Sequence, residues 1–127
     1  DLTGVAKQIT KADLIGFDIE ADDFLLLKTR NSNTEDFDFE FVFVDRTGAE
    51  YLVSKQIAGV GIDSLGIERD QEDHATHKQL LSSGIIIIEG LRLKEVPDRE
   101  YFMVAAPLKL QNVEAAPARV LLFDQNL

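Results

Sequence analysis

The chain has 127 residues, with 13 basic and 23 acidic side chains and a formal net charge of −10. Its length predicts a single domain over residues 1–127, and its hydrophobic content of 45% is ordinary for a globular protein. The negative charge excludes a general nucleic-acid binder, because phosphate recognition needs a positive surface. The absence of cysteine excludes thiolate metal sites and disulfides and is typical of a reducing, cytoplasmic compartment. No run of about 20 apolar residues predicts a membrane span.

The first half of the chain predicts short helices that alternate with strands. Thr10 followed by Asp13 is typical of a helix start, and Gly16 of a helix end. Residues 24–29 form a short apolar run that predicts a buried strand. The sequence from Thr47 to Glu50 matches a capping box, so residues 47–56 are expected to be helical.

A stripe of phenylalanines with a period of two lies in residues 35–43. If this segment is extended, all of its phenylalanines fall on one face, which we call the Phe37–Phe43 face: Phe37, Phe39, Phe41 and Phe43. Packing in the core is the expected role of this face. The alternatives are an aromatic-binding pocket or an association surface.

Two aliphatic strands, residues 59–63 and 85–89, each end in an acidic residue. They are expected to be buried, and two further strands are expected at residues 101–110 and 119–124. Strands that alternate with helices predict a layered α/β fold with a mixed sheet and covering helices.

A predicted reversal at Gly84 brings an imidazole towards a carboxylate. We expect a helix capped by Asp70 or Asp73 to run to about Ser83, with Gly84 just beyond its end. The helix from His77 rises about 9 Å, and the returning strand spans about 13 Å, so Glu89 can come back near His77. An imidazole and a carboxylate can be two ligands of a divalent metal ion.

Plainer interpretations stand beside this one. His77 can be a histidine on a helix surface and Glu89 an acid that merely ends a strand, since two ligands do not make a metal site. His74 lies one helical turn before His77, and solvated surface is its expected role rather than metal ligation. Asp63 is expected to cap a loop by accepting backbone N–H hydrogen bonds.

Five ordered segments carry a family resemblance: residues 24–29 (FLLLKT), residues 59–63 (GVGID), His77 with Glu89 twelve positions later, residues 106–110 (APLKL) and residues 116–119 (APAR). Together they resemble the cyclase family of metal-dependent hydrolases, which includes bacterial kynurenine formamidase and isatin hydrolase. The resemblance covers most of the chain and implies a swivelling β/β/α domain and assembly into homo-oligomers.

The resemblance also implies a chemistry and a metal. His77 and Glu89 correspond to metal ligands of the family, with zinc as the expected ion and manganese as a second possibility. Family members hydrolyse C–N bonds of formamides or cyclic amides with a metal-activated water as the nucleophile. A small-molecule amide is therefore the expected substrate.

The family's His-rich signature, His-x-Gly-Thr-His-x-Asp-x-Pro-x-His, is missing from this sequence, which contains two histidines in all. Because that signature supplies the catalytic histidine and most of the metal ligands, the catalytic residues cannot be assigned in this chain. We expect them on an upstream segment, and we expect the chain, which opens with Asp1, to be the C-terminal portion of an incomplete cyclase-like domain. That segment is lost, cleaved or a separate chain that associates with this one.

The sequence therefore predicts part of a metal-dependent amide or formamide hydrolase, whose active site this chain does not complete alone. The alternative is a non-catalytic cyclase-like module that binds or assembles through the Phe37–Phe43 face. A third possibility is a small acidic α/β domain with a coincidental resemblance. Finding His77 and Glu89 on opposite sides of the fold would favour that possibility.

Overall fold

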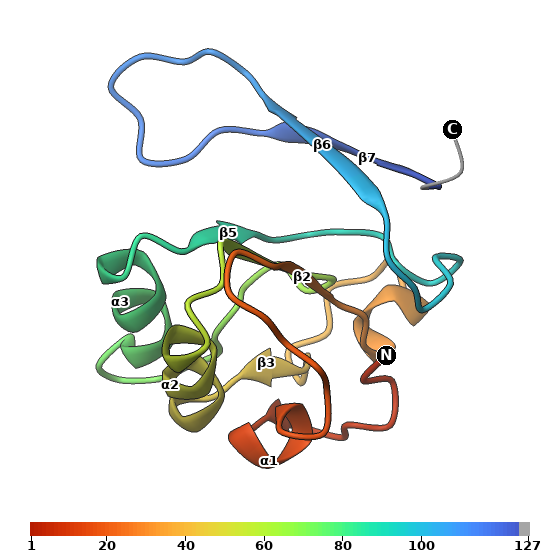
Figure 1. Cartoon of the computed structure of the whole chain (residues 1–127), viewed down its shortest axis with the longest axis vertical. Helices are drawn as coiled ribbons and strands as arrows, with labels where there is room; N and C mark the ends of the chain where they lie inside the picture. Colours follow the sequence, from red (N-terminus) through yellow and green to blue (C-terminus); the bar gives the residue numbers. More distant parts are fainter. Residues whose placement is uncertain (125–127) are drawn as a thin grey trace. The chain divides into compact units, whose positions relative to one another are not determined.

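The computed structural model describes residues 1–124 (Figure 1). These residues form two compact units, Asp1–Val96 and a second unit that begins at Pro97. The larger unit contains, in chain order, β1 (Gln8–Ile9), α1 (Lys11–Leu14), β2 (Phe24–Leu27), the 3-10 helix η1 (Arg30–Asn33), β3 (Phe43–Val44), α2 (Arg46–Ser54), β4 (Gly59–Ile62), α3 (Ala75–Ser82) and β5 (Ile86–Ile88). The smaller unit contains β6 (Phe102–Pro107) and β7 (Ala118–Phe123). The predicted mixed α/β fold is confirmed. No helix in residues 1–124 is long and apolar enough to cross a membrane.

The main sheet of the larger unit has the strand order β2-β4-β5, and all its neighbours are parallel. Strands β1 and β3 form a separate parallel pair. The carboxyl ends of parallel strands lie along one edge of a sheet, and ligands of open α/β sheets bind at this carboxyl edge. Asp63 follows β4 and Glu89 follows β5, so both predicted acidic strand ends lie at this edge.

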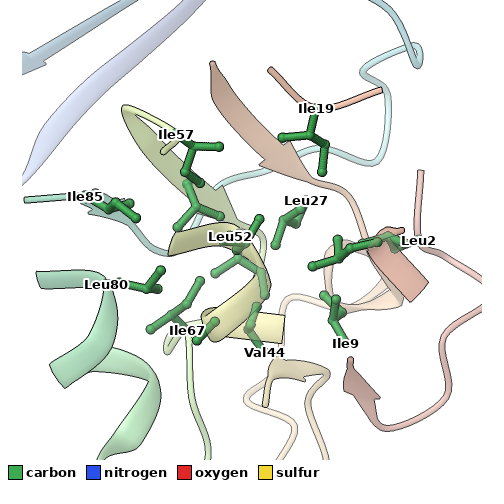
Figure 2. Packing of buried hydrophobic residues seen from close by; sticks show 14 of the residues in the cluster. Leu2, Ile9, Ile19, Leu27, Val44, Leu52, Ile57, Ile67, Leu80 and Ile85 are labelled. Carbon is green, nitrogen blue, oxygen red and sulfur yellow. The ribbon is translucent and has the colours of Figure 1, made fainter. Parts of the chain in front are cut away.

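The core of the larger unit is a continuous aliphatic cluster contributed by helices, strands and loops (Figure 2). Leu52 of α2, Leu80 of α3 and Ile62 of β4 are all fully buried in it. Helix α2 packs against both α1 and α3, and α1 and α2 lie below β2 and β5 in the view of Figure 1. Gly48 permits a close approach of α2, because a β-carbon there would lie 2.7 Å from the carbonyl oxygen of Ile9.

The helix starts agree with the sequence at α1 and differ at α2. The Asp13 carboxylate accepts hydrogen bonds from the backbone N–H and the hydroxyl of Thr10, at 2.8 and 2.6 Å, so the predicted start is confirmed. The predicted capping box at Thr47 is wrong. The N-cap of α2 is Asp45, two residues earlier, because the Asp45 carboxylate accepts from the Gly48 N–H at 2.9 Å and from the Thr47 hydroxyl at 2.8 Å.

The predicted extended Phe37–Phe43 face is wrong, since only Phe43 lies in a strand. Phe37 and Phe39 are 52% and 80% exposed, so core packing is also wrong for them. The physical reason is a turn at Asp38, whose carbonyl oxygen accepts from the Phe41 N–H at 3.1 Å. The Arg30 guanidinium holds this turn through the Asp38 carboxylate at 2.9 Å.

Strand β5 is less buried than its sequence predicts. Ile86 is 58% exposed, although Ile85 beside it is buried. The cause is the position of β5 at an edge of the three-stranded sheet, where among residues 1–124 it pairs only with β4. An unbroken aliphatic run therefore predicted the strand but not its burial.

In the smaller unit, β6 and β7 pair as an antiparallel hairpin, which confirms both predicted strands. Phe102 and Phe123 face each other across the hairpin with ring centroids 6.3 Å apart. Arg99 pairs with Asp124 at 2.5 Å and donates to the Tyr101 hydroxyl at 3.2 Å. The Tyr101 phenol, and also the Asp124 carboxylate, raise the pKa of the Arg99 guanidinium above its ordinary value, although desolvation acts in the opposite direction.

Candidate metal centre

The reversal after α3 forms as predicted. The helix ends at Ser82, and Gly84 adopts a left-handed backbone with φ 75°. The Ile85 N–H then donates to the carbonyl oxygen of Leu80 at 3.0 Å, which turns the chain into β5. A glycine after a helix end allows this conformation without steric cost.

His77 and Glu89 meet across this reversal. The His77 Nε2 atom lies 3.3 Å from Glu89 Oε1, so the predicted proximity is confirmed. The two side chains are 35% and 33% exposed, which leaves both accessible from solvent. The two residues therefore do not lie on opposite sides of the fold, which was the finding that would favour a coincidental resemblance.

Glu89 is held by the backbone of the loop that follows β4. Its Oε1 atom accepts a hydrogen bond from the N–H of Ile67 at 2.7 Å, and Ile67 is fully buried in the core. The Ile67 carbonyl accepts from the Val44 N–H of β3 at 2.8 Å, so this part of the loop is fixed from both sides. The position of the Glu89 carboxylate is thus set by packed backbone.

His77 is held by Glu68, a residue for which the sequence predicts no role. The Glu68 carboxylate is only 4% exposed, and its Oε1 atom lies 2.8 Å from His77 Nδ1. Its Oε2 atom accepts from the backbone N–H groups of Thr76 and His77, at 2.9 and 3.3 Å. Glu68 therefore caps the start of α3 and contacts the imidazole with the same carboxylate.

The predicted capping of α3 by Asp70 or Asp73 is wrong. The residue at the N-cap position is His74, which has a left-handed backbone with φ 49° and makes no capping hydrogen bond with its side chain. Asp73 instead forms an ion pair with Arg46. Glu68 lies in the loop eight residues before Thr76, so the sequence pattern at the helix start does not predict it as the cap.

Glu68 is stabilised as a carboxylate. Burial alone would raise its pKa, but the hydrogen bonds from the His77 side chain and backbone outweigh burial and hold the pKa below its ordinary value. His74 adds a contact from Nδ1 to Oε1 at 3.0 Å, while its own side chain is 71% exposed, as the sequence predicts. The buried Glu68 carboxylate is therefore stabilised by the N-terminus of α3 and by contacts with two imidazoles.

Asp63 caps a loop, as predicted, and does so more extensively than the sequence indicates. It is 4% exposed, and its carboxylate accepts from the N–H groups of Thr29 and Ser32 at 2.9 and 3.3 Å. Both hydroxyls of these residues donate to it as well, at 2.7 and 2.8 Å. These bonds tie the 3-10 helix η1 to the end of β4.

The donor atoms of His77 and Glu89 fit a divalent metal ion as two of its ligands. An imidazole nitrogen and a carboxylate oxygen converge from the solvent side, and both side chains are fixed by further contacts, as metal ligands usually are. Within residues 1–124 no group of three or more His, Asp or Glu side chains is arranged to hold a metal ion. The two side chains alone therefore do not complete a metal site within the described residues.

A cavity of about 150 Å³ lies at the same edge of the sheet. Its lining includes Phe37, Phe41, Leu65, Leu91 and Arg92. Phe37 and Phe41 pack edge to face with centroids 6.2 Å apart. Two of the phenylalanines thus line a hollow, which agrees with the pocket alternative for this stripe.

The chain matches a known family in sequence. The family described as "Putative cyclase" matches residues 3–69, more than half of the chain. The chain therefore belongs to the cyclase family. A kynurenine formamidase from Bacillus cereus is 30% identical over 91% of this chain and 56% of the relative. A kynurenine formamidase from Polaromonas naphthalenivorans is 30% identical over 77% of this chain and 44% of the relative.

Two solved structures share the fold. One, described as a potential metal-dependent hydrolase with cyclase activity, is 62% identical, with a TM-score of 0.97 over 99% of this chain and 63% of the other. A second, described as a predicted metal-dependent hydrolase from Bacillus stearothermophilus, is 63% identical, with a TM-score of 0.93 over 95% of this chain and 59% of the other. The chain thus spans about half to two thirds of the proteins that it matches.

Proposed function

We propose that this chain is part of a metal-dependent hydrolase that cleaves the C–N bond of formamides or cyclic amides. The observation that carries the proposal is the convergence of His77 Nε2 and Glu89 Oε1 at 3.3 Å in a member of the cyclase family. The names of the relatives, kynurenine formamidase and metal-dependent hydrolase, support the same reaction class. The proposed substrate is a small-molecule amide.

In this proposal His77 and Glu89 bind a divalent cation, and the other ligands come from outside this sequence. Nitrogen and oxygen donors suit zinc or manganese, and we propose zinc first. When bound, the ion supplies Lewis acidity towards an amide carbonyl and makes a coordinated water more acidic. The Ile67 N–H donates to Glu89 Oε1 at 2.7 Å and so orients this carboxylate.

The cavity beside this edge suggests where the organic part of a substrate lies. Phe37 and Phe41 offer aromatic faces, and Arg92 offers a cation at the rim. Because aromatic rings favour edge-to-face contacts, this lining supports an aryl amide better than an aliphatic one. We also propose a cytoplasmic protein, in line with the absence of cysteine, and a homo-oligomer that buries the exposed Phe39, which does not line the cavity.

The test uses the intact gene product that carries this sequence. Its intact mass and metal content are measured, followed by formate release from a formylated arylamine such as formanilide. We expect bound divalent metal and formate release, and we expect both to fall in His77→Ala. An intact product that holds no metal and releases no formate after addition of Zn²⁺ or Mn²⁺ would contradict the proposal.

A further inference from the structure

The two oxygens of the buried Glu68 carboxylate have different partners. Oε2 accepts from the backbone N–H groups of Thr76 and His77 at the start of α3. Oε1 lies 2.8 Å from His77 Nδ1 and 3.0 Å from His74 Nδ1. One oxygen therefore stabilises the helix end, and the other faces the imidazole rings.

The contact at Oε1 fixes where His77 can carry its proton. An ionised carboxylate only accepts hydrogen bonds, and a neutral imidazole has one N–H, so between two carboxylates the hydrogen is favoured on the nitrogen with the shorter and more buried contact. The Nδ1 contact is shorter than the 3.3 Å contact between Nε2 and Glu89. It also involves the more buried carboxylate, at 4% against 33% exposed. A neutral His77 therefore carries its hydrogen on Nδ1.

We propose that Glu68 is a positioning residue that holds His77 in the Nδ1–H tautomer, so that the lone pair of Nε2 points towards Glu89 and is available to a metal ion. The metal part of this inference rests on the proposed function, whereas the tautomer does not. A ligating histidine needs a free lone pair, and a carboxylate on its other nitrogen fixes both the tautomer and the ring orientation.

The loop after β4 thus organises both proposed ligands from adjacent positions. The Ile67 N–H holds Glu89 at 2.7 Å, and the Glu68 side chain holds His77. Because Ile67 is fully buried and Glu68 nearly so, movement of either ligand would require a shift of packed structure. The arrangement keeps the two donor atoms together before any metal binds.

Glu68→Gln separates the capping role from the positioning role. Two backbone N–H groups face Oε2, so the amide oxygen of glutamine takes that place and the cap is kept. The amide NH₂ group then faces the imidazoles and donates to His77 Nδ1. We therefore expect His77 to change to the Nε2–H tautomer in this variant, while α3 stays folded.

The tautomer is read from two-bond ¹H–¹⁵N correlation spectra of the full chain, at a pH where the spectra show neutral rings. With two histidines in the sequence, the spectrum holds two imidazoles, and His74→Asn assigns them. Asparagine suits position 74 because it tolerates the left-handed backbone. We expect Nδ1–H for His77 in the wild type and in His74→Asn, and Nε2–H in Glu68→Gln.

Wild-type His77 in the Nε2–H form would overturn the inference without any variant. An unchanged tautomer in a folded Glu68→Gln, judged by circular dichroism, would also overturn it. Zinc affinity, measured by titration calorimetry on the intact gene product that carries this sequence, tests the metal part. We expect Glu68→Gln to weaken zinc binding about tenfold or more, and Lys78→Ala, at an exposed position of α3, to leave it within about twofold. Equal affinity in Glu68→Gln and wild type would refute the positioning role, whereas a wild type that binds no zinc would contradict the proposed function instead.

Discussion

The imidazole of His77 and the carboxylate of Glu89 meet at 3.3 Å, although one lies in helix α3 and the other follows strand β5. The left-handed Gly84 turns the chain between these two elements, and the Ile67 N–H fixes the Glu89 carboxylate. The parallel sheet places the end of β5 beside the end of β4, from which the supporting loop departs. A proposed pair of metal ligands is thus built by secondary structure and one ordered loop.

Removal of either member of the pair is expected to weaken metal binding. His77→Ala deletes the nitrogen donor, and Glu89→Ala deletes the oxygen donor that faces it. We expect each variant to lose more than about tenfold in zinc affinity, measured by equilibrium dialysis of the intact gene product. Lys78→Ala is the control, since Lys78 is exposed on α3 next to His77 in the sequence. Wild-type metal content in both alanine variants would refute the assignment.

The sequence alone could predict the pair and could not predict its support. Helix and strand lengths around Gly84 are local quantities, so they sufficed to bring His77 and Glu89 together. Glu68 reaches α3 across a loop in which His74 has a left-handed backbone. Helix-start patterns describe only residues next to the first turn, so they indicate Asp70 or Asp73 and not Glu68, which lies eight residues before Thr76.

For the Phe37–Phe43 face, the sequence predicted a strand that does not form. Alternation of phenylalanine with acidic residues is the pattern of a half-buried strand. The structure instead turns at Asp38, because the Arg30 guanidinium and the Glu40 N–H both bind its carboxylate, at 2.9 and 2.8 Å. Arg69 also donates to the Phe41 carbonyl at 3.1 Å. These tertiary contacts outweigh β propensity, which depends strongly on context.

Asp63→Asn is expected to destabilise the larger unit. The carboxylate accepts hydrogen bonds from the backbone and hydroxyl groups of Thr29 and Ser32, whereas an asparagine offers one acceptor oxygen and turns an NH₂ group towards donors. Loss of buried hydrogen bonds to a charged group costs about 2–3 kcal/mol in the free energy of unfolding. Urea denaturation measures this loss, and the exposed Asp18→Asn serves as the control. Equal midpoints for both variants would contradict the structural role of Asp63.

Gly48→Ala is expected to lower stability although alanine favours helices. Its β-carbon would lie 2.7 Å from the Ile9 carbonyl oxygen and 3.0 Å from a Val44 methyl carbon, and the backbone atom cannot move without disturbing β1. We expect a net loss of about 1–2 kcal/mol in the free energy of unfolding, because overpacking outweighs the gain in helix propensity. Gly16→Ala is the control, since no heavy atom lies within 4 Å of its new β-carbon. A Gly48→Ala protein as stable as the control would show that α2 can shift freely.

The turn at Asp38 gives a pH prediction with a defined sign. The Glu40 N–H, and next the Arg30 guanidinium, hold the pKa of Asp38 below its ordinary value of 3.8. A lowered folded pKa contributes stability above the unfolded pKa, and that contribution is lost as the pH falls through the folded pKa. In Arg30→Met we expect the pKa of Asp38 to rise towards 3.8 without reaching it, because the Glu40 N–H remains. A ¹³C carboxyl titration by NMR checks this, with Arg92→Met as the control. An unchanged pKa in Arg30→Met would contradict the contact.

Phe39 provides a test of the proposed self-association. It is 80% exposed and packs edge to face on Phe37 with centroids 4.7 Å apart, so the two rings form a continuous apolar surface. Burial of a phenylalanine in an interface contributes about 1.5–3 kcal/mol, so Phe39→Ser should weaken dimerisation about tenfold or more. Analytical ultracentrifugation over a concentration series measures the change. Leu81→Ser, at a residue 58% exposed on α3, is the matched loss of apolar surface elsewhere and should leave association unchanged. A monomeric wild type would exclude the oligomer, and equal effects of the two serine variants would place the interface away from the phenylalanines.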